Sequence, residues 1–273
     1  MALELDDRQR AMLLEMGVRV WMPGTSFAPP SPPQQQTAPR AASASHAPSL
    51  DTAPAAKPVQ PQYTPPVPQI QSTANSALQA IDGEALAKAC TTCQACGLCA
   101  GRKHSTLNGE ALATQADWMV VGDPPDEEED QSASPFAGQS GVLLGNMLRA
   151  VGVQRGSAGA QGAYVSNVVK CRPPHGHVVQ TAELAQCAQF LNREIELIQP
   201  KMIVSMGRFA NQLLLSEHAE LANQPLGKLR GTLYRYQGIP VLVTYHPKVL
   251  LRASADKAKA WADLCLAVKA LRI

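Results

Sequence analysis

The sequence predicts an α/β fold, with a central four-stranded parallel sheet, helices on both of its faces and a disordered tether in front of it. Apolar residues make up 45% of the 273 residues, which is enough to bury a sizeable core. Four short apolar runs rich in strand-forming residues alternate with longer stretches of helical periodicity. Alternation of this kind is typical of βαβ units, in which helices cover both faces of a parallel sheet.

Each element of this fold can be assigned to a range of the sequence. The predicted strands are 118–121, 164–169, 202–206 and 239–245. The predicted helices are 141–151, 181–198, 207–215 and 255–271. Ligands of open parallel sheets bind beyond the carboxyl ends of the strands. The polar motifs that follow these strands are therefore candidates for a functional site.

Composition divides the chain into three segments. Residues 1–23 are predicted to contain a short amphipathic helix that Gly17 is placed to stop, followed by an apolar tail that includes Trp21. So short a helix is marginal alone and needs a partner surface. Residues 24–76 are a linker rich in Pro, Ala, Ser and Gln; 13 of the 22 prolines lie between Pro23 and Pro68. Such a segment is predicted to be disordered. Residues 77–273 contain the predicted sheet.

Charge is unevenly distributed, although the net charge is only +2. Six acidic residues crowd into 123–130, whereas 131–273 hold 16 Lys and Arg against seven Asp and Glu. This balance suits a polyanionic partner, but a solvated mixed surface would have it too. No apolar run of 18 residues and no signal sequence occurs, so we expect a cytoplasmic protein without a membrane segment.

The cysteines indicate metal or redox chemistry rather than disulfides in a cytoplasmic chain. They are Cys90, Cys93, Cys96, Cys99, Cys171, Cys187 and Cys265. A Cys-x-x-Cys pair and two later cysteines can supply four thiolates to zinc or to a 4Fe–4S cluster. Because the cysteines in 90–99 repeat every third residue, all four of them could instead ligate locally, or some could be buried thiols. Spacing alone selects neither the metal nor its ligands.

Three further motifs follow predicted strands. The acidic loop 122–130 is either a solvated loop or part of a site, and Phe136 lies just beyond it. Asn167 ends the second strand and offers both a donor and an acceptor to a nucleobase edge, although a lone Asn is more often a turn residue. His246 follows the fourth strand. Convergence of these motifs on one sheet edge favours a functional site.

Seven segments carry a family resemblance between residues about 85 and 265: CQACGLCAGR, VGDPPDEEED, PFAGQSGVLLGNML, SNVVKCRPP, KMIVSMGRFA, LRG and TYHPKVLLR. In this order and spacing they resemble the family 4 uracil-DNA glycosylases. The resemblance implies an N-glycosyl hydrolase that flips uracil out of DNA and removes it to start base excision repair. It also implies a 4Fe–4S cluster held by Cys93, Cys96, Cys171 and Cys187, with Cys90, Cys99 and Cys265 as non-ligands.

The resemblance assigns a role to each pocket residue. Phe136 would stack on uracil, Asn167 would read its Watson–Crick edge and His246 would donate to uracil O2 as negative charge develops there. Asp123 and Glu129 occupy the two acidic positions, where a carboxylate would orient water and stabilise an oxocarbenium-like sugar.

The same resemblance suggests where DNA lies. The loop that presses into DNA matches Leu250, Leu251 and Arg252. The basic residues Lys170, Arg172 and Lys248 are further candidates for contacts with the DNA backbone.

The sequence also departs from the family, and these departures support an alternative. Asp123 stands where the family has Glu, Asp126 where it has Gly, and residues 175–179 lack the usual Asn-Arg and Pro. Residues 12–23, MLLEMGVRVWMP, resemble the start of the psi subunit of the bacterial clamp loader. The chain could therefore be a psi-like replisome subunit with a degenerate glycosylase domain as scaffold or DNA-binding module. A third reading is a tethered glycosylase that binds the clamp loader through residues 1–23.

Overall fold

The computed structural model describes residues 78, 80–217, 219–222 and 224–271. The segments predicted at 1–23 and 24–76, and the predicted domain start at residue 77, lie outside the described residues. None of the described helices is both long enough and apolar enough to cross a membrane.

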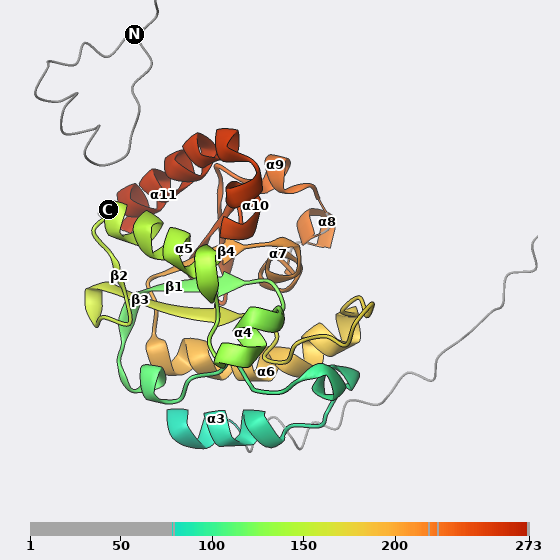
Figure 1. Ribbon diagram of the computed structural model, residues 1–273. Coiled ribbons are helices and arrows are strands. Elements are labelled where there is room, and N and C mark those ends of the chain that lie inside the picture. The colour runs from blue at the N-terminus through green and yellow to red at the C-terminus, as the bar shows by residue number, and fades with distance from the viewer. Residues whose placement is uncertain (1–77, 79, 218, 223, 272–273) are drawn as a thin grey trace, which may run out of the picture. The chain divides into compact units, whose positions relative to one another are not determined.

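Within the described part of the chain, six strands form one sheet in the order β2-β3-β1-β4-β6-β5 (Figure 1). The strands are β1 (Ala116–Gly122), β2 (Gln154–Arg155), β3 (Gly159–Asn167), β4 (Met202–Met206), β5 (Leu233–Tyr236) and β6 (Ile239–Thr244). The four predicted strands are β1, β3, β4 and β6, and these pair in parallel. The predicted α/β class is confirmed.

The predicted number of four strands is wrong, because the sheet gains a short strand at each edge. Two-residue β2 pairs in parallel with β3, and β5 pairs antiparallel with β6. Gln237 and Gly238 connect β5 to β6, and both have a positive φ, 50° and 81°. That is the backbone of a two-residue hairpin turn, whose twist matches that of the strands. The turn therefore folds β5 back along the sheet.

Helices cover both faces of the sheet (Figure 1). On one face, apolar side chains of α3, α6 and α7 pack with Met119 and Ile203 in one core cluster. On the other face, α5 and α11 pack with Val120 and Val204 in a second cluster. The helices are α3 (Gly83–Thr92), α4 (Glu127–Ser132), α5 (Gly138–Ala150), α6 (Thr181–Ile198), α7 (Arg208–Leu214), α8 (Ala219–Ala222), α9 (Leu226–Leu229), α10 (Pro247–Arg252) and α11 (Lys257–Leu271), with 3-10 turns η1 (Gly97–Gly101), η2 (Glu110–Ala113) and η3 (Ser254–Asp256).

The acidic loop begins a helix rather than being wholly solvated. Asp126 caps α4, accepting from the backbone N–H of Glu129, and the Glu129 carboxylate accepts from the N–H of Asp126 in return. This reciprocal capping box satisfies two N–H groups that a helix start otherwise leaves free. The acidic residues of the first turn also interact favourably with the positive end of the helix dipole. The run of acids therefore has a structural reason beside any functional one.

Register brings the ends of the central strands to one edge. Gly122 of β1 pairs with Asn167 of β3 and with Met206 of β4, and Met206 pairs with Thr244 of β6. The segments that follow β1, β4 and β6 therefore start side by side, next to the last residue of β3. This edge is where ligands of parallel sheets bind.

Candidate active site

Two aromatic rings lie in contact at this edge. The rings of Phe136 and His246 are stacked, with centroids 4.8 Å apart and planes 9° from parallel. Phe136 is 1% exposed and has a left-handed backbone, with φ of 52°. Arg155 steadies this turn, because its guanidinium donates to the carbonyls of Pro135 and Phe136 at 2.6 and 3.2 Å.

Gly122 leaves the space that the ring of Phe136 occupies at the end of β1. A Cβ atom at this position would lie 2.5 Å from Cζ and 2.6 Å from Cε2 of Phe136, and 3.5 Å from Nε2 of His246. Real Cβ atoms do not approach ring carbons so closely. Glycine is therefore required at the end of β1 for the aromatic ring to lie against the strand.

Glu129 joins the parts of the pocket. Its carboxylate is 1% exposed. One oxygen, Oε1, accepts from the backbone N–H of Phe136 at 2.6 Å and from Nδ2 of Asn167 at 3.2 Å. The other, Oε2, accepts from the N–H of Asp126 at 3.0 Å and from Nζ of Lys248 at 2.7 Å. Four protein donors thus occupy the Glu129 carboxylate. It therefore positions the neighbouring groups rather than binding water.

Asn167 presents an acceptor without a partner. Its Nδ2 donates to the carbonyl of Asp123 at 2.9 Å as well as to Glu129. Its Oδ1 is buried and has no hydrogen-bond partner in the described structure. Leaving a buried carbonyl oxygen unpaired costs about 1–3 kcal/mol. The amide is therefore fixed with its oxygen ready to accept from an N–H donor of a ligand.

His246 is a neutral donor. It caps the start of α10, and its Nδ1 accepts from the backbone N–H of Lys248 at 3.2 Å. The proton of the neutral ring is therefore on Nε2, the atom that can donate to a ligand. Burial lowers the pKa of His246 from 6.5 to about 4; the charge of Lys248 acts in the same direction and Asp126 opposes it.

The Asp123 carboxylate is held by backbone N–H groups, and the residue also lines a cavity. Its carboxylate accepts from the backbone N–H groups of Arg208, Phe209 and Ala210 at the start of α7, at 3.2, 2.7 and 3.4 Å. Burial raises its pKa, which these N–H groups oppose. Asp123 and His246 both line a cavity of about 440 Å³. The two side chains thus face a common space that holds room for a small ligand.

Residues 110–265 match the family model of the uracil DNA glycosylase superfamily. A type-4 uracil-DNA glycosylase of Thermotoga maritima is 35% identical over 168 residues, which are 61% of this chain and 82% of the relative. The chain is a member of the type-4 uracil-DNA glycosylase family. The type-4 enzymes of Sulfurisphaera tokodaii and Archaeoglobus fulgidus are 34% and 33% identical, over 59% and 50% of this chain and 71% and 68% of theirs.

Six of the seven cysteines of this type-4 family member line one small cavity, together with Lys170 and Phe190. They are Cys90, Cys93, Cys96, Cys99, Cys171 and Cys187. Cys265 is exposed on α11, apart from them. They come from α3, η1 and its preceding loop, the segment after β3, and α6, so the fold gathers four parts of the sequence around one space.

The thiols around the cavity differ in their hydrogen bonds. Burial raises the pKa of the Cys90 thiol to about 12, and Ser105 Oγ donates to its sulfur at 3.1 Å. Burial also raises the pKa of Cys171, whose sulfur accepts from Arg102 at 3.2 Å. No group of three or more His, Cys, Asp or Glu side chains among the described residues is arranged to hold a single metal ion. Six thiols around one cavity can supply the four thiolates that a metal cluster needs.

Two of the predicted DNA contacts of this glycosylase family member are wrong. Lys170 is 0% exposed and Leu250 is 1% exposed, so neither side chain can reach a DNA strand. Lys170 pairs with a buried carboxylate, and Leu250 points inward from α10. The other four are at least partly exposed at this end of the molecule. They are Arg172, Lys248, Leu251 and Arg252.

A buried polar network, missed by the sequence prediction, surrounds Lys170. Its Nζ donates to Ser166 Oγ at 2.6 Å, to the carbonyl of Asn167 at 2.7 Å and to Glu194 Oε2 at 2.5 Å. The hydroxyl of Tyr164 donates to Glu194 Oε1 at 2.7 Å. One signal was available, because Glu194 lies on the apolar stripe of the predicted helix 181–198. An acid on such a stripe indicates a buried ion pair.

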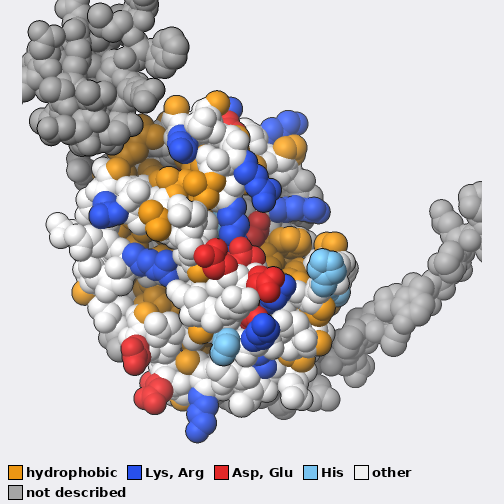
Figure 2. Space-filling model, in the orientation of Figure 1, with side chains coloured by type: hydrophobic (Ala, Val, Ile, Leu, Met, Phe, Trp, Pro, Cys, Tyr) orange, Lys and Arg blue, Asp and Glu red, His pale blue; other side chains and the backbone are white. Residues whose placement is uncertain are grey.

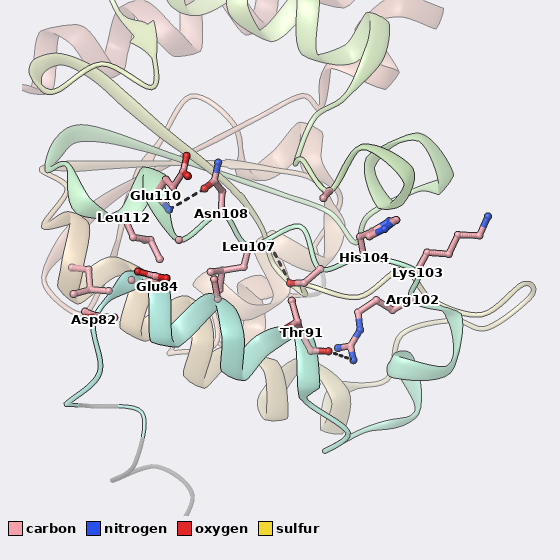
Figure 3. A pocket seen from close by; sticks show the side chains of 16 residues that line it. Asp82, Glu84, Thr91, Arg102, Lys103, His104, Leu107, Asn108, Glu110 and Leu112 are labelled. Atoms are coloured by element: carbon pink, nitrogen blue, oxygen red, sulfur yellow. Dashed lines mark hydrogen bonds between the residues drawn. The ribbon is translucent and has the colours of Figure 1, made fainter.

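A larger cavity lies elsewhere. About 1140 Å³ in volume, it lies between α3 and the segment 102–112, and none of the predicted pocket residues lines it (Figure 3). Figure 3 shows Arg102 directed toward Thr91, whose carbonyl accepts from Nη2 at 2.7 Å. Acidic side chains gather around α3 and η2 and basic ones around 102–104. This cavity therefore has no part in the candidate active site.

Proposed function

We propose that this member of the type-4 family flips uracil out of DNA and hydrolyses its N-glycosidic bond with Asn167, His246 and Asp123. The observation that carries the proposal is that an unpaired hydrogen-bond acceptor and a hydrogen-bond donor lie at the same edge of the sheet. The buried Oδ1 of Asn167 lacks a donor, and the neutral ring of His246 carries a donor at Nε2. Uracil offers an N–H at position 3 and a carbonyl oxygen at position 2, which match this acceptor and this donor.

The same acceptor supports discrimination between bases. Cytosine has no hydrogen on N3, so it would leave Asn167 Oδ1 facing a lone pair. A site built to accept a hydrogen bond rejects a ligand without that donor strongly, because a buried polar group then stays unpaired. Glu129 and the Asp123 carbonyl hold the amide from behind, so that it cannot rotate without losing two hydrogen bonds.

In the reaction, the bond between C1′ of the deoxyribose and N1 of uracil breaks, and its electron pair moves onto the base. Negative charge grows on O2, where His246 Nε2–H donates to it; a preorganised donor of this kind lowers the barrier by several kcal/mol. Water adds to C1′ and gives up a proton to solvent, and the uracil anion takes up a proton, so that the products are an abasic sugar and neutral uracil. Asp123 is the better candidate to orient that water, because Glu129 already accepts from four donors.

We infer that Cys93, Cys96, Cys171 and Cys187 hold a 4Fe–4S cluster. The cysteine-lined cavity and membership of the type-4 family support this set. When bound, the cluster would crosslink three parts of the chain: the segment 93–96, the segment after β3, and α6. This is a structural role, since hydrolysis transfers no electrons. In this assignment Cys90, which accepts from Ser105, and Cys99 pack beside the ligands.

Residues outside the described structure also enter the proposal. We infer a catalytic domain that begins near residue 77, preceded by a linker at 24–76 and a partner-binding helix at 1–23. Because residues 12–23 resemble the start of a psi subunit, the clamp loader is the proposed partner of residues 1–23. A peptide of residues 1–23 should bind clamp-loader complex in a titration, and Trp21→Ala should weaken it; a peptide without affinity would rule this partner out.

The proposed activity is tested by uracil release. Single-stranded and duplex oligonucleotides with one uracil are incubated with protein, and abasic sites are quantified. Asn167→Ala and His246→Ala should lower excision by roughly 10²–10³-fold, because they remove interactions made with the flipped base. A wild-type protein that releases no uracil from either substrate refutes the function and leaves the psi-like scaffold.

The cluster is tested separately by metal analysis. Protein purified without oxygen should contain about four irons per chain. Cys171→Ser should lose this iron, whereas the matched change Cys265→Ser on α11 should not. Zinc in place of iron, or full iron in Cys171→Ser, would contradict the assignment.

A further inference from the structure

Lys248 lies between two carboxylates at the rim of the pocket. It is the second residue of α10, and its Nζ lies 2.6 Å from Asp126 Oδ2 and 2.7 Å from Glu129 Oε2. The two acids are the cap and the third residue of α4, so a single ammonium group ties α10 to the first turn of α4. Figure 2 shows acidic and basic side chains gathered in the middle of this face, over the region between these helices.

The three groups differ in exposure. Lys248 is 34% exposed at its side chain and Asp126 44%, but Glu129 is only 1% exposed. A buried carboxylate is costly unless it is paired and hydrogen-bonded. Burial alone would lower the pKa of Lys248, but the two acids reverse this and raise it, so the side chain is charged. Within the described structure, Lys248 is the only cation that pairs with Glu129.

The Glu129 carboxylate fixes the positions of two pocket residues, Phe136 and Asn167. Its Oε1 holds the backbone of Phe136 and the amide of Asn167, while Lys248 holds Oε2 of the same carboxylate. A shift or rotation of this carboxylate therefore moves the stacking ring and the base-reading amide together. Lys248 is thus linked to Phe136 and Asn167 through the Glu129 carboxylate, and in the described structure its ammonium group makes no hydrogen bond with either.

We propose that Lys248 is a positioning residue for uracil excision, which aligns Phe136 and Asn167 by fixing the Glu129 carboxylate between them. This inference rests on the proposed function. It differs from the role that the sequence indicates for Lys248, a contact with the DNA backbone. Asp126 contributes to this positioning, because its more exposed carboxylate forms the second ion pair with the Lys248 ammonium group.

The two roles of Lys248 predict different kinetics. A positioning residue changes the geometry of the bound base, and a misplacement of about 1 Å can cost roughly 100-fold in rate. A backbone contact supplies uniform binding, so its loss raises KM, leaves kcat unchanged and lowers the salt dependence of binding by about one charge.

The experiment measures kcat and KM for a single-stranded oligonucleotide with one uracil, at several salt concentrations. Lys248→Met should lower kcat roughly 10- to 100-fold with little change in KM or in salt dependence. Lys248→Arg should recover most of kcat, because a guanidinium can pair with both carboxylates. Lys201→Met is the matched control: this exposed lysine pairs with Asp117, outside the pocket, and should leave both constants unchanged.

Thermal unfolding and iron content are measured on each variant. If Lys248→Met does not fold, Lys248→Gln takes its place, because a shorter polar side chain suits the half-exposed position but removes the ammonium group that fixes Glu129. A folded Met or Gln variant with wild-type kcat overturns the inference, and a raised KM with reduced salt dependence assigns Lys248 to DNA binding instead. A wild-type protein without activity overturns the proposed function and this inference together, which distinguishes the two failures.

Discussion

The ring of His246 should remain neutral until the pH falls to about 4. Burial is the main cause, and the ammonium of Lys248 adds to it, while the carboxylate of Asp126 acts in the opposite direction. The pKa falls from 6.5 to about 4, and one pKa unit corresponds to about 1.4 kcal/mol. The folded protein therefore favours the neutral ring by about 3 kcal/mol relative to the unfolded chain.

This preference links stability to pH with a definite sign. Because the pKa of His246 is lower in the folded protein, the unfolded chain takes up the proton first. The contribution is complete above about pH 6.5 and is lost progressively as the pH falls from 6.5 to about 4. Near pH 5 about 2 kcal/mol of the free energy of unfolding should be gone on this account alone.

Two measurements check the value. In an NMR titration of the histidine rings, the signal that disappears in His246→Asn should titrate near pH 4, and the rate of uracil excision should show no step near pH 6.5. In urea unfolding, wild type should lose about 2 kcal/mol more than His246→Asn between pH 7 and pH 5. A ring that titrates at its ordinary pKa, with equal losses in both proteins, would refute the account of His246 as a buried neutral donor.

Three other substitutions probe the packing and the ion pairs. Gly122→Ala should push the ring of Phe136 aside and lower excision roughly 10-fold or more at a stability cost of about 1–3 kcal/mol, and wild-type kinetics would contradict the close contact. Lys170→Met should destabilise the fold by about 3–5 kcal/mol in urea unfolding, since it leaves Glu194 buried without its cation; the double change with Glu194→Leu should restore much of this, and a milder single variant would argue against the buried pair. Lys201→Ala should cost under about 1 kcal/mol, because its ion pair is exposed, and a larger loss would show that surface pairs matter more here than expected.

The sequence located the central strands because they are buried on both faces and therefore read as uninterrupted apolar runs. Helix α6 was predicted with its observed bounds, since its apolar stripe persists over five turns. The edge strands were missed for the opposite reason: β2 consists of two exposed residues, and in β5 only Tyr236 is buried. The Gln237-Gly238 turn was the available signal for β5.

The candidate site was predictable where it depends on strand ends and unpredictable where it depends on pairing across the fold. Phe136, Asn167 and His246 come together because parallel strands end at one edge. By contrast, the burial of Lys170 depends on a carboxylate 24 residues away on α6. A lysine at the end of a strand reads as a surface residue until its partner is known.

The contact between Phe136 and His246 affects product release. Rings 4.8 Å apart touch, so no planar base fits between them, and a base that stacks on the face of Phe136 covered by His246 requires the two rings to separate. Separating the rings reduces the apparent affinity of every ligand by the same factor. A uracil still joined to DNA offsets this loss through contacts along the strand, but a released base has none. Free uracil should therefore inhibit the enzyme weakly, and the pocket should close behind it as the rings come together again.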